Sequence, residues 1–551
     1  MSNGLRKEKR AVKKTFLGQL YEDNRVVLNV LTIVFMGMVI VGVPFYTKFT
    51  YGSIGTDKRV MFTGFLQFYW KLVVPFLGLH LGLFVVDCVR RKGFGLASLR
   101  RGLAGFSVTD WCVVGYMGVV VISYLGSDYK DVAALGNDKW SMGALMQLSL
   151  GAGYFLISRF WNRKVWMVML MLPVSGVLFL LGYLNRFNIW PIPMEVNGNP
   201  QFISLAGNIN WYCGYLVTIL FGAVYLLWSG VFVKSWPKNV LRGYLFVGFC
   251  ALTTNGNSSG ILTLLGIFFV LLLVSVGDVH KLERYCEIAL ILGASCVFTL
   301  IIRVLFPTAI TYQETSNNLF TYSPLPIILV LLALGMLLWS RSLRKKGTYP
   351  VRLFRILARC LVLFCILAVV IFTILLVVNT IAPGSIGPLS DIGIFTFSPS
   401  WGSRRGATWM AGAMAWWELP FLKKLFGVGP DCMGEFLYRD GSDALLNLLY
   451  TVWPNERLSN AHCEWLTVLV NLGLLGLISF GGIIITSVYR FLKNGAKQSD
   501  PYGFLVGACG LAILAYSIHN VVSFQQILNE PAMFVILGIG AAYSQTKAAN
   551  S

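Results

Sequence analysis

Two short polar stretches in the last third of the chain carry residue types that group-transfer chemistry needs. The first, "SRRGATW" (403–409), places Arg404 and Arg405 side by side. Paired guanidinium groups can clamp a diphosphate through bidentate hydrogen bonds. The second, "LSNAHCEW" (458–465), holds His462, whose neutral imidazole can accept a proton from a hydroxyl group. The two stretches together predict an anion clamp and a base.

Both stretches also have a structural interpretation. Arginines beside apolar helices commonly extend toward lipid headgroups, and His462 lies where a polar loop meets an apolar run, so it can simply end a helix. If Ser459 or Asn460 caps that helix, His462 falls in its first turn, where the helix dipole disfavours the imidazolium. Glu464 then points to another side of the helix, and we treat it as a secondary site candidate.

The chain has only four histidines, so the other three can be weighed one by one. His80 lies in an apolar run and is expected to be a packed residue. His280 lies beside Lys281 and is expected to be exposed to solvent. His519 ends an apolar run in "YSIHNVVSFQQ". Ionisable residues within membrane helices often mark functional sites, so His519 is a secondary candidate.

Two further arginines are candidate ligands for an anion. Arg303 lies near the end of an apolar run, where a charge needs a partner, and is the preferred second ligand after Arg405. Arg186, in "NRFNIWPIPME", is a secondary candidate. Extension toward the membrane surface is the alternative explanation for both.

The elements that must position these residues are membrane helices. Hydrophobic residues make up 56% of the 551 and charged residues only 13%, and the mean hydropathy is +0.69. A soluble globular protein needs more polar surface than this. Apolar runs of about 20 residues span a bilayer, and we expect roughly 14 of them, giving an all-α polytopic fold with roughly 12–14 transmembrane helices. Their approximate spans are 26–46, 61–88, 111–125, 142–158, 166–184, 204–227, 241–253, 259–277, 285–306, 324–339, 357–381, 461–489, 502–522 and 531–545.

The distribution of Lys and Arg predicts the orientation of the helices. These residues favour cytoplasmic loops, and with the N-terminus inside, 31 of the 45 fall in cytoplasmic segments and 12 in outer ones. The prediction is a basic cytoplasmic segment (1–25), eleven transmembrane helices (26–381), a large extracytoplasmic loop (382–460), C-terminal transmembrane helices (461–545) and a cytoplasmic tail (546–551). Topology thus accounts for most of the net charge of +21, and no nucleic-acid partner is expected.

The long outer loop should be folded. It is rich in Gly, Trp and apolar residues rather than in disorder-promoting ones. Its sequence predicts a helix over 406–417, broken by Pro420 and followed by a turn at Gly427 and Gly429. The eleven cysteines form no disulfide framework or metal-binding pattern, although Cys432 and Cys463 both lie on the outer side, where a disulfide remains an alternative.

The order of these features resembles a known family. From Arg405 the chain reads Arg-x-x-x-Trp, an apolar helix, "LFGVGPD", a polar stretch and "AHCEWLTVLVNLGLLGLISF". Over residues 403–480 this is similar to the O-antigen ligase and polymerase family of membrane glycosyltransferases. Asp431 departs from the family pattern by replacing the last Gly of the turn, and Cys463 replaces the Asn that usually follows the His.

Looser likeness extends to two earlier segments. "AGNINWYCGYL" (206–216) is similar to the Asn-rich helix start of the family, and "NGNSSGILTLLG" (255–266) to its Ser-Arg-Gly motif. Ser259 stands where that motif has Arg, which removes one candidate phosphate ligand.

The resemblance implies a GT-C-like enzyme of the bacterial cytoplasmic membrane. Its donor would be a saccharide on a polyprenyl diphosphate, typically undecaprenyl diphosphate, and its acceptor a hydroxyl of a glycan or glycolipid on the extracytoplasmic face. His462 would be the catalytic residue, and Arg405, Arg404 and Arg303 would bind the diphosphate while inversion occurs at the anomeric carbon. No cofactor is implied. The outer loops contain no Asp-x-Asp, so we expect no metal.

Other functions compete with this one. A flippase or transporter of lipid-linked oligosaccharides would also have 12 to 14 helices, although such proteins often show internal repeats, and none is evident in this chain. A structural membrane protein would leave the ordered Arg and His pattern unexplained. Polymerase and ligase share the same donor chemistry, so the sequence does not separate them.

Overall fold

The computed structural model describes residues 16–48, 54–90, 105–138, 140–192, 201–232, 234–310, 315–496 and 502–545. These residues fold almost entirely into α-helices, so the predicted all-α polytopic fold is confirmed. In the described part, ten helical segments are long and apolar enough to cross a membrane. They are Phe16–Phe45, Gly55–Asp87, Val108–Gly126, Val165–Arg186, Ile209–Ser229, Ser258–Ser275, Val279–Leu305, Leu325–Lys346, Val351–Ile381 and Glu464–Gly495.

Every apolar segment expected from the sequence is helical. Four of them fall outside the ten candidate spans because they are shorter or less apolar. All four pack against neighbouring helices. These four are α7 (Ala144–Phe160), α11 (Ser235–Thr254), α22 (Gly503–His519) and α23 (Asn529–Ser544).

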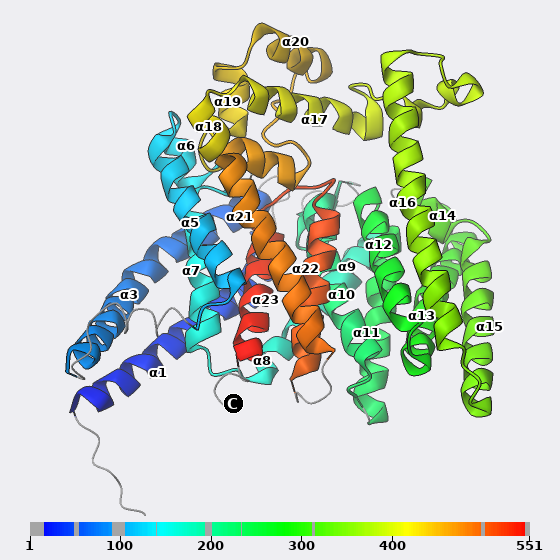
Figure 1. The fold of residues 1–551 in the computed structure, drawn as a ribbon, viewed down its shortest axis with the longest axis horizontal. Helices are drawn as coiled ribbons and strands as arrows, with labels where there is room; N and C mark the ends of the chain where they lie inside the picture. The colour runs from blue at the N-terminus through cyan, green and yellow to red at the C-terminus, as the bar shows by residue number, and fades with distance from the viewer. Residues whose placement is uncertain are drawn as a thin grey trace, which may run out of the picture.

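The core of the bundle lies around α10 (Ile209–Ser229), α22 and α23, whose side chains are almost all buried. Helix α22 packs against both α10 and α21 (Glu464–Gly495), and α23 packs against α7 (Figure 1). Helices α5 (Val108–Gly126) and α9 (Met171–Arg186) continue the bundle on either side of this centre.

Two asparagines explain why the Asn-rich stretches start helices. A short hairpin of β1 (Phe202–Ile203) and β2 (Gly207–Asn208) leads into α10, and the Asn208 side chain accepts a hydrogen bond from the backbone of the first turn. Asn257 caps α12 (Ser258–Ser275) in the same way. A side-chain oxygen at this position satisfies a backbone N–H that has no partner within the helix.

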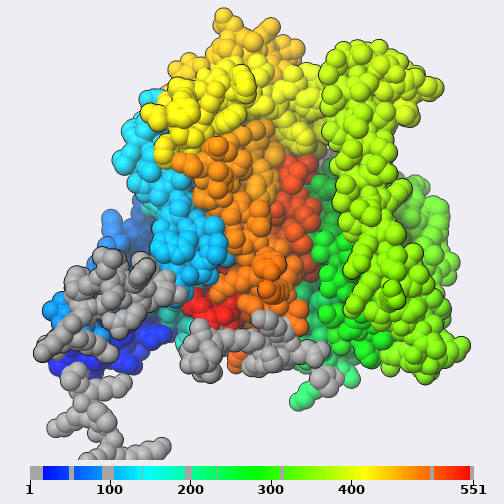
Figure 2. Space-filling view, in the orientation of Figure 1, coloured from blue at the N-terminus to red at the C-terminus, as the bar shows by residue number. Residues whose placement is uncertain are grey.

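Two groups of helices form the edges of the bundle. One edge holds α1 (Phe16–Gly37), a π-helical turn (Met38–Gly42), α2 (Val43–Phe45) and α3 (Ile54–Arg90). The other edge holds α13 (Val279–Leu305), α14 (Thr315–Thr321), α15 (Leu325–Lys346) and α16 (Val351–Ile381). Most apolar side chains of α16 are exposed in the isolated chain, and Figure 2 shows this helix standing at the rim of the molecule.

Short helices cover one end of the bundle, between α16 and α21. The polypeptide passes through two 3₁₀ turns, η3 (Gly387–Asp391) and η4 (Gly393–Phe395), before it enters these helices. Helix α1 begins and α23 ends at the opposite end (Figure 1). The covering helices are α17 (Trp401–Glu418), α18 (Phe421–Phe426), α19 (Met433–Arg439) and α20 (Asp443–Val452), together with α6 (Lys130–Leu135), which follows α5.

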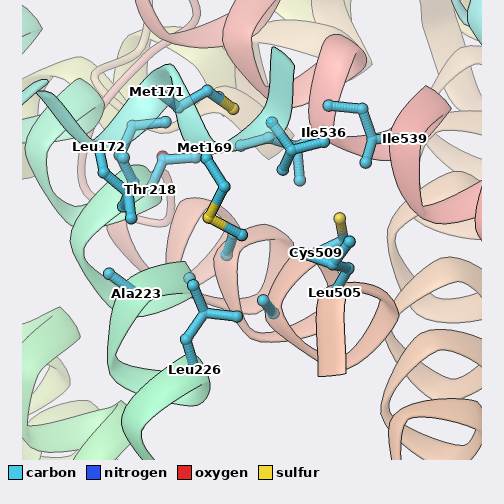
Figure 3. A pocket seen from close by; sticks show the side chains of 15 residues that line it. Met169, Met171, Leu172, Thr218, Ala223, Leu226, Leu505, Cys509, Ile536 and Ile539 are labelled. Atoms are coloured by element: carbon cyan, nitrogen blue, oxygen red, sulfur yellow. The ribbon is translucent and has the colours of Figure 1, made fainter. Parts of the chain in front are cut away.

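An apolar cavity of about 60 Å³ lies among α8 (Val165–Met169), α10, α22 and α23, and Figure 3 shows the side chains that line it. Small residues such as Gly222 and Ala512 leave this space. The Thr218 hydroxyl donates back to the Gly214 carbonyl at 2.7 Å and so contributes little polarity. Apart from the Cys509 thiol and the Thr218 hydroxyl, the described residues that line the cavity are apolar, so we interpret it as a packing feature.

Candidate functional site

His462 lies in the loop that precedes α21. Its backbone is left-handed, with φ of +47°, and its N–H donates to the Asn460 side chain at 2.9 Å. The helix begins at Glu464 after Cys463, which makes no side-chain cap. The expectation that Ser459 or Asn460 caps the helix and places His462 in its first turn is therefore wrong. Asn460 instead fixes a local turn, a common role for this side chain.

The His462 ring is kept neutral by its surroundings and not by the start of a helix. The ring packs edge-on against Phe524, with centroids 5.1 Å apart, and its Nδ1 atom is buried without a hydrogen-bond partner in the described part. Burial, and then the positive charge of Arg405, lowers the pKa of His462 to about 4. The imidazole is therefore neutral near pH 7.

Arg405 and Arg404 face different surroundings although they are neighbours. Gly402, Ser403 and Arg404 adopt left-handed conformations inside the segment assigned to α17, so regular helix starts at Arg405. This agrees with the expected helix start near Gly406. The Arg405 guanidinium donates to the carbonyls of Val522 at 3.3 Å and Gly402 at 3.1 Å, whereas Arg404 is exposed.

The segment from His519 to Glu530, which we call the polar floor, joins Arg405 to His462. Arg405 contacts Val522, and His462 contacts Phe524 only two residues further on. This segment connects α22 and α23 and is rich in buried polar side chains. They are His519, Asn520, Ser523, Gln525, Gln526, Asn529 and Glu530.

Glu464 belongs to the support of the polar floor. Its carboxylate accepts hydrogen bonds from the Tyr516 hydroxyl at 2.8 Å and from the Asn520 side chain. The other end of the Asn520 amide lies 2.7 Å from His519 Nδ1. Glu464 therefore faces α22 and not His462, as its spacing from His462 suggested.

Several polar atoms of the floor have no partner in the described part of the chain. Both carboxylate oxygens of Glu530, both polar side-chain atoms of Asn529, and His519 Nε2 are buried without a hydrogen bond. Buried polar groups are normally hydrogen-bonded, and each exception needs an explanation. A set of donors and acceptors of this kind suits the hydroxyl groups of a sugar.

Arg186 contacts the second Asn-rich stretch, which is itself hydrogen-bonded to the first. It is buried at the end of α9 and donates to the backbone carbonyl of Asn255. The Asn257 side chain donates to the Asn210 side chain at 2.5 Å, and the Ser259 hydroxyl donates to Asn257 at 2.7 Å. Arg186, an arginine from another helix, thus lies beside the segment in which Ser259 stands where the family motif has Arg.

Helix α10 connects the Asn-rich stretches with the polar floor. Cys213 contacts the Ser259 hydroxyl at 3.8 Å. The next residue, Gly214, packs so closely that an added Cβ would meet the Asn529 amide at 2.6 Å and His519 Cε1 at 3.2 Å. Glycine at this position lets the two polar regions approach each other.

Arg303 lies elsewhere. Its guanidinium donates to Asn318 at 3.0 Å and to Thr321 at 2.6 Å, and it stacks over the Tyr322 ring at 4.5 Å. These partners belong to α14 and the turn after it. The expected partner for a charge in an apolar run is thus present, but none of these contacts reaches His462.

Comparison with known proteins gives a match for the segment that holds Arg404, Arg405, His462 and Glu464. Residues 316–481 match the family model described as O-antigen ligase. This segment is therefore similar to the O-antigen ligase family, and we call residues 316–481 the O-antigen ligase domain after the model that they match. The match confirms the resemblance drawn from residues 403–480 and extends it back to α14, over less than a third of the chain. No curated protein and no solved structure matches the chain.

The O-antigen ligase domain supplies only part of the site. Arg404, Arg405, His462 and Glu464 lie inside the matched segment, whereas Arg186, His519 and the rest of the polar floor lie outside it. The floor was missed in the sequence apart from His519. The dense run of amides in "HNVVSFQQILNE" between two apolar helices was the available signal.

The turn of the O-antigen ligase domain around Asp431 ties the covering helices to the bundle. Asp431 is left-handed, with φ of +61°, and its carboxylate accepts from the backbone N–H groups of Asn137 at 2.7 Å and Met142 at 3.0 Å. Burial raises its pKa to about 7, although both hydrogen bonds act in the opposite direction. The expected turn is present, with positive φ at Gly427 and Gly429.

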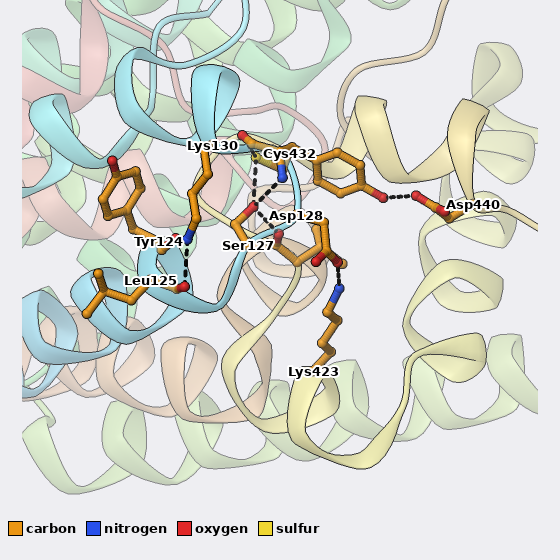
Figure 4. A network of polar contacts seen from close by, with 10 residues as sticks. Tyr124, Leu125, Ser127, Asp128, Lys130, Lys423, Cys432 and Asp440 are labelled. Carbon is orange, nitrogen blue, oxygen red and sulfur yellow. Dashed lines mark hydrogen bonds and ion pairs between the residues drawn. The ribbon is translucent and has the colours of Figure 1, made fainter.

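Residues 124–130, which we call the anchor corner, hold the same domain from the side of α5 (Figure 4). The Ser127 hydroxyl donates to the Val428 carbonyl at 2.7 Å, Asp128 pairs with Lys423, and the Tyr129 hydroxyl donates to Asp440.

Cys432 and Cys463 are both free thiols, so the alternative of a disulfide between them is wrong. Among the described residues no group of three or more His, Cys, Asp or Glu side chains is arranged to hold a metal ion.

Proposed function

We propose that this protein is a membrane glycosyltransferase that moves a saccharide from a polyprenyl diphosphate, of the undecaprenyl type, to an acceptor hydroxyl. The observation that carries the proposal is the meeting of His462 and Arg405 over the polar floor. Arg405 is close enough to lower the pKa of His462, and both side chains contact residues 522–524. The O-antigen ligase domain supports the same reaction class.

The proposed reaction is a direct displacement. The acceptor oxygen attacks the anomeric carbon while neutral His462 takes the hydroxyl proton. The bond between the anomeric carbon and the diphosphate oxygen breaks, so the configuration inverts and the polyprenyl diphosphate leaves with the bonding electrons. Arg405 stabilises the negative charge that accumulates on this leaving group.

Other cations have lesser proposed roles. Arg404 is exposed at the start of the regular helix and can reach the second phosphate. Arg186, beside the Asn-rich stretches, is a candidate for the place left by Ser259. Arg303 is the weakest of the predicted ligands, because its hydrogen bonds go to α14.

We place the site on the extracytoplasmic face of a bacterial cytoplasmic membrane, with both chain ends in the cytoplasm. The excess of Lys and Arg in the segments opposite α17 to α20 supports this orientation. The boundaries of the outer loop at 382–460 belong to the same proposal. Fixed arginines can neutralise the diphosphate, so we propose that transfer needs no metal ion.

The test is to incubate the purified protein with a lipid-linked oligosaccharide, with and without EDTA, and to resolve the products by size. A growing ladder identifies a polymerase, and a product that forms only after a second acceptor is added identifies a ligase. Movement of the donor across the bilayer without a new glycosidic bond would overturn the proposal in favour of a flippase. Loss of product in EDTA would overturn the metal-independent mechanism.

A further inference from the structure

A second polar region lies at the end of the bundle opposite α17 to α20. A pocket of about 800 Å³ separates the turn between α12 and α13 from the first turns of α16. Lys281, Arg355 and Arg359 line it together with a single acidic residue, Asp278. Helix α16 starts at the end where α15 finishes, away from the polar floor (Figure 1).

The cations of this pocket differ from their neighbours in their partners. Arg344 pairs with Glu283 at 2.7 Å, and Arg242 pairs with Glu287 at 2.5 Å. No ion pair joins Lys281, Arg355 or Arg359 to a carboxylate within the described ranges.

Among the described residues that line the pocket, the one acidic residue, Asp278, is already engaged in hydrogen bonds. The Asp278 carboxylate accepts from the backbone N–H groups of His280 and Lys281 at the start of α13. Three cations against one capped carboxylate leave the pocket positively charged.

The walls of the pocket are polar at one level and apolar at the next. Arg355 lies over the turn, since a Cβ added to Gly277 would meet its Nε at 3.4 Å. Arg355, Ala358, Arg359 and Val362 follow the spacing of one helix face, so both guanidinium groups share the pocket side of α16.

Farther from the charged end of the pocket the lining becomes apolar, and Val274 and Leu363 there are exposed on the surface of the bundle. Leu273 and Val274 come from α12, and Leu363 comes from α16. A ligand that fits both levels has an anionic head and an apolar tail.

We propose that this pocket binds an anionic phospholipid. Lys281, Arg355 and Arg359 hold its phosphate, and an acyl chain lies along Leu273, Val274 and Leu363. Basic pockets between membrane helices are suited to such headgroups. The lipid fills the space between α16 and the neighbouring helices. This accounts for the many apolar side chains of α16 that no other part of the protein covers. The site is independent of the proposed transfer reaction.

The test measures binding of fluorescent phosphatidylglycerol to the purified full chain in nonionic detergent. Arg355→Gln/Arg359→Gln should weaken binding at least tenfold. The matched control Arg341→Gln/Arg352→Gln removes two exposed arginines outside the pocket and should change the affinity less than twofold. Ala358→Trp, which fills the pocket without changing charge, should also weaken binding.

Three results would overturn the proposal. They are unchanged affinity in the pocket variants, an equal loss in the control, and equal affinity of the wild type for fluorescent phosphatidylcholine. Free phosphate is a separate source of the same chemistry, so millimolar inorganic phosphate is added as a competitor. Displacement of the lipid by phosphate alone would assign the pocket to a soluble anion. Glycosyl transfer, measured in parallel, should be unchanged in the pocket variants.

Discussion

The anchor corner and the polar floor are both polar regions near the same end of the molecule, but their hydrogen bonding differs. At the anchor corner, Ser127, Asp128 and Tyr129 each have a partner in the O-antigen ligase domain. In the polar floor, Asn529 and Glu530 are fully buried without one in the described part. Satisfied groups hold a structure together, whereas each unsatisfied buried group in a native fold needs an explanation. The contrast supports a structural role for the anchor corner and the proposal of a substrate-binding role for the polar floor.

The largest effect on transfer is expected from His462→Ala. Loss of the base should lower kcat about 10²–10⁴-fold while the protein remains inserted and abundant. The measurement is single-turnover transfer from a lipid-linked donor, with His280→Ala, an exposed histidine outside the site, as the control. Normal turnover in the His462 variant would place the site elsewhere.

Arg405→Gln should lower kcat about 10²–10³-fold, the effect of removing one charged donor from a developing anion. It should also change the pH profile of the residual activity. Arg405 helps to lower the pKa of His462, so the pKa of His462 should rise in the variant. As the pH is lowered, the variant should therefore lose its activity at a higher pH than the wild type does. The exposed Arg457→Gln is the control, and an unshifted acid limb would contradict the coupling.

Glu530→Gln tests whether the unpartnered floor contacts substrate. If its carboxyl group forms a hydrogen bond with a sugar hydroxyl, the isosteric amide should lower kcat/KM about tenfold or more, with little change in thermal stability. Glu435→Gln, in α19, controls for removal of an acidic residue from the same end of the molecule. A variant with raised stability and full activity would show that buried Glu530 destabilises the fold and does not contribute to transfer.

The smallest effect on transfer is expected from Asp431→Asn, which alters the support. Its folded pKa of about 7 exceeds the usual value of 3.8, so the folded state binds its proton more tightly. Its contribution to stability is present below pH 4 and is lost as pH rises through 7, on the order of 4 kcal/mol. Unfolding of the Asn variant should lack this pH dependence, while kcat stays within about twofold. A variant with the wild-type pH dependence would contradict the assignment.

Much of the fold followed from hydrophobic periodicity. The expected apolar segments are all helices, and the helix over 406–417 lies within α17. Its end at Glu418 and the turn at Gly427 also agree, since Pro and Gly act locally. These features depend on neighbours in the sequence and so can be predicted from it.

The arrangement of the candidate site was only partly predictable. His462 and Arg405 were identified by type and order, but the route that joins them runs through Val522 and Phe524, more than 50 residues away in the chain. Arg303 was chosen because a charge in an apolar run needs a partner, and α14 provides neutral partners that sequence spacing does not reveal. Long-range packing decided both outcomes.

Helix α21 contains a break with a mechanical consequence. Its 32 residues extend about 48 Å, longer than the hydrocarbon core of about 30 Å. Gly473, with φ of +69°, interrupts the helical geometry. A Cβ added at this position would meet the Leu425 backbone at 2.3 Å. The break divides α21 into an inner half and an outer half, and the outer half packs against α18. We therefore expect a change in the tilt of the inner half of α21 to be taken up at Gly473, while the outer half, next to His462, stays packed against α18.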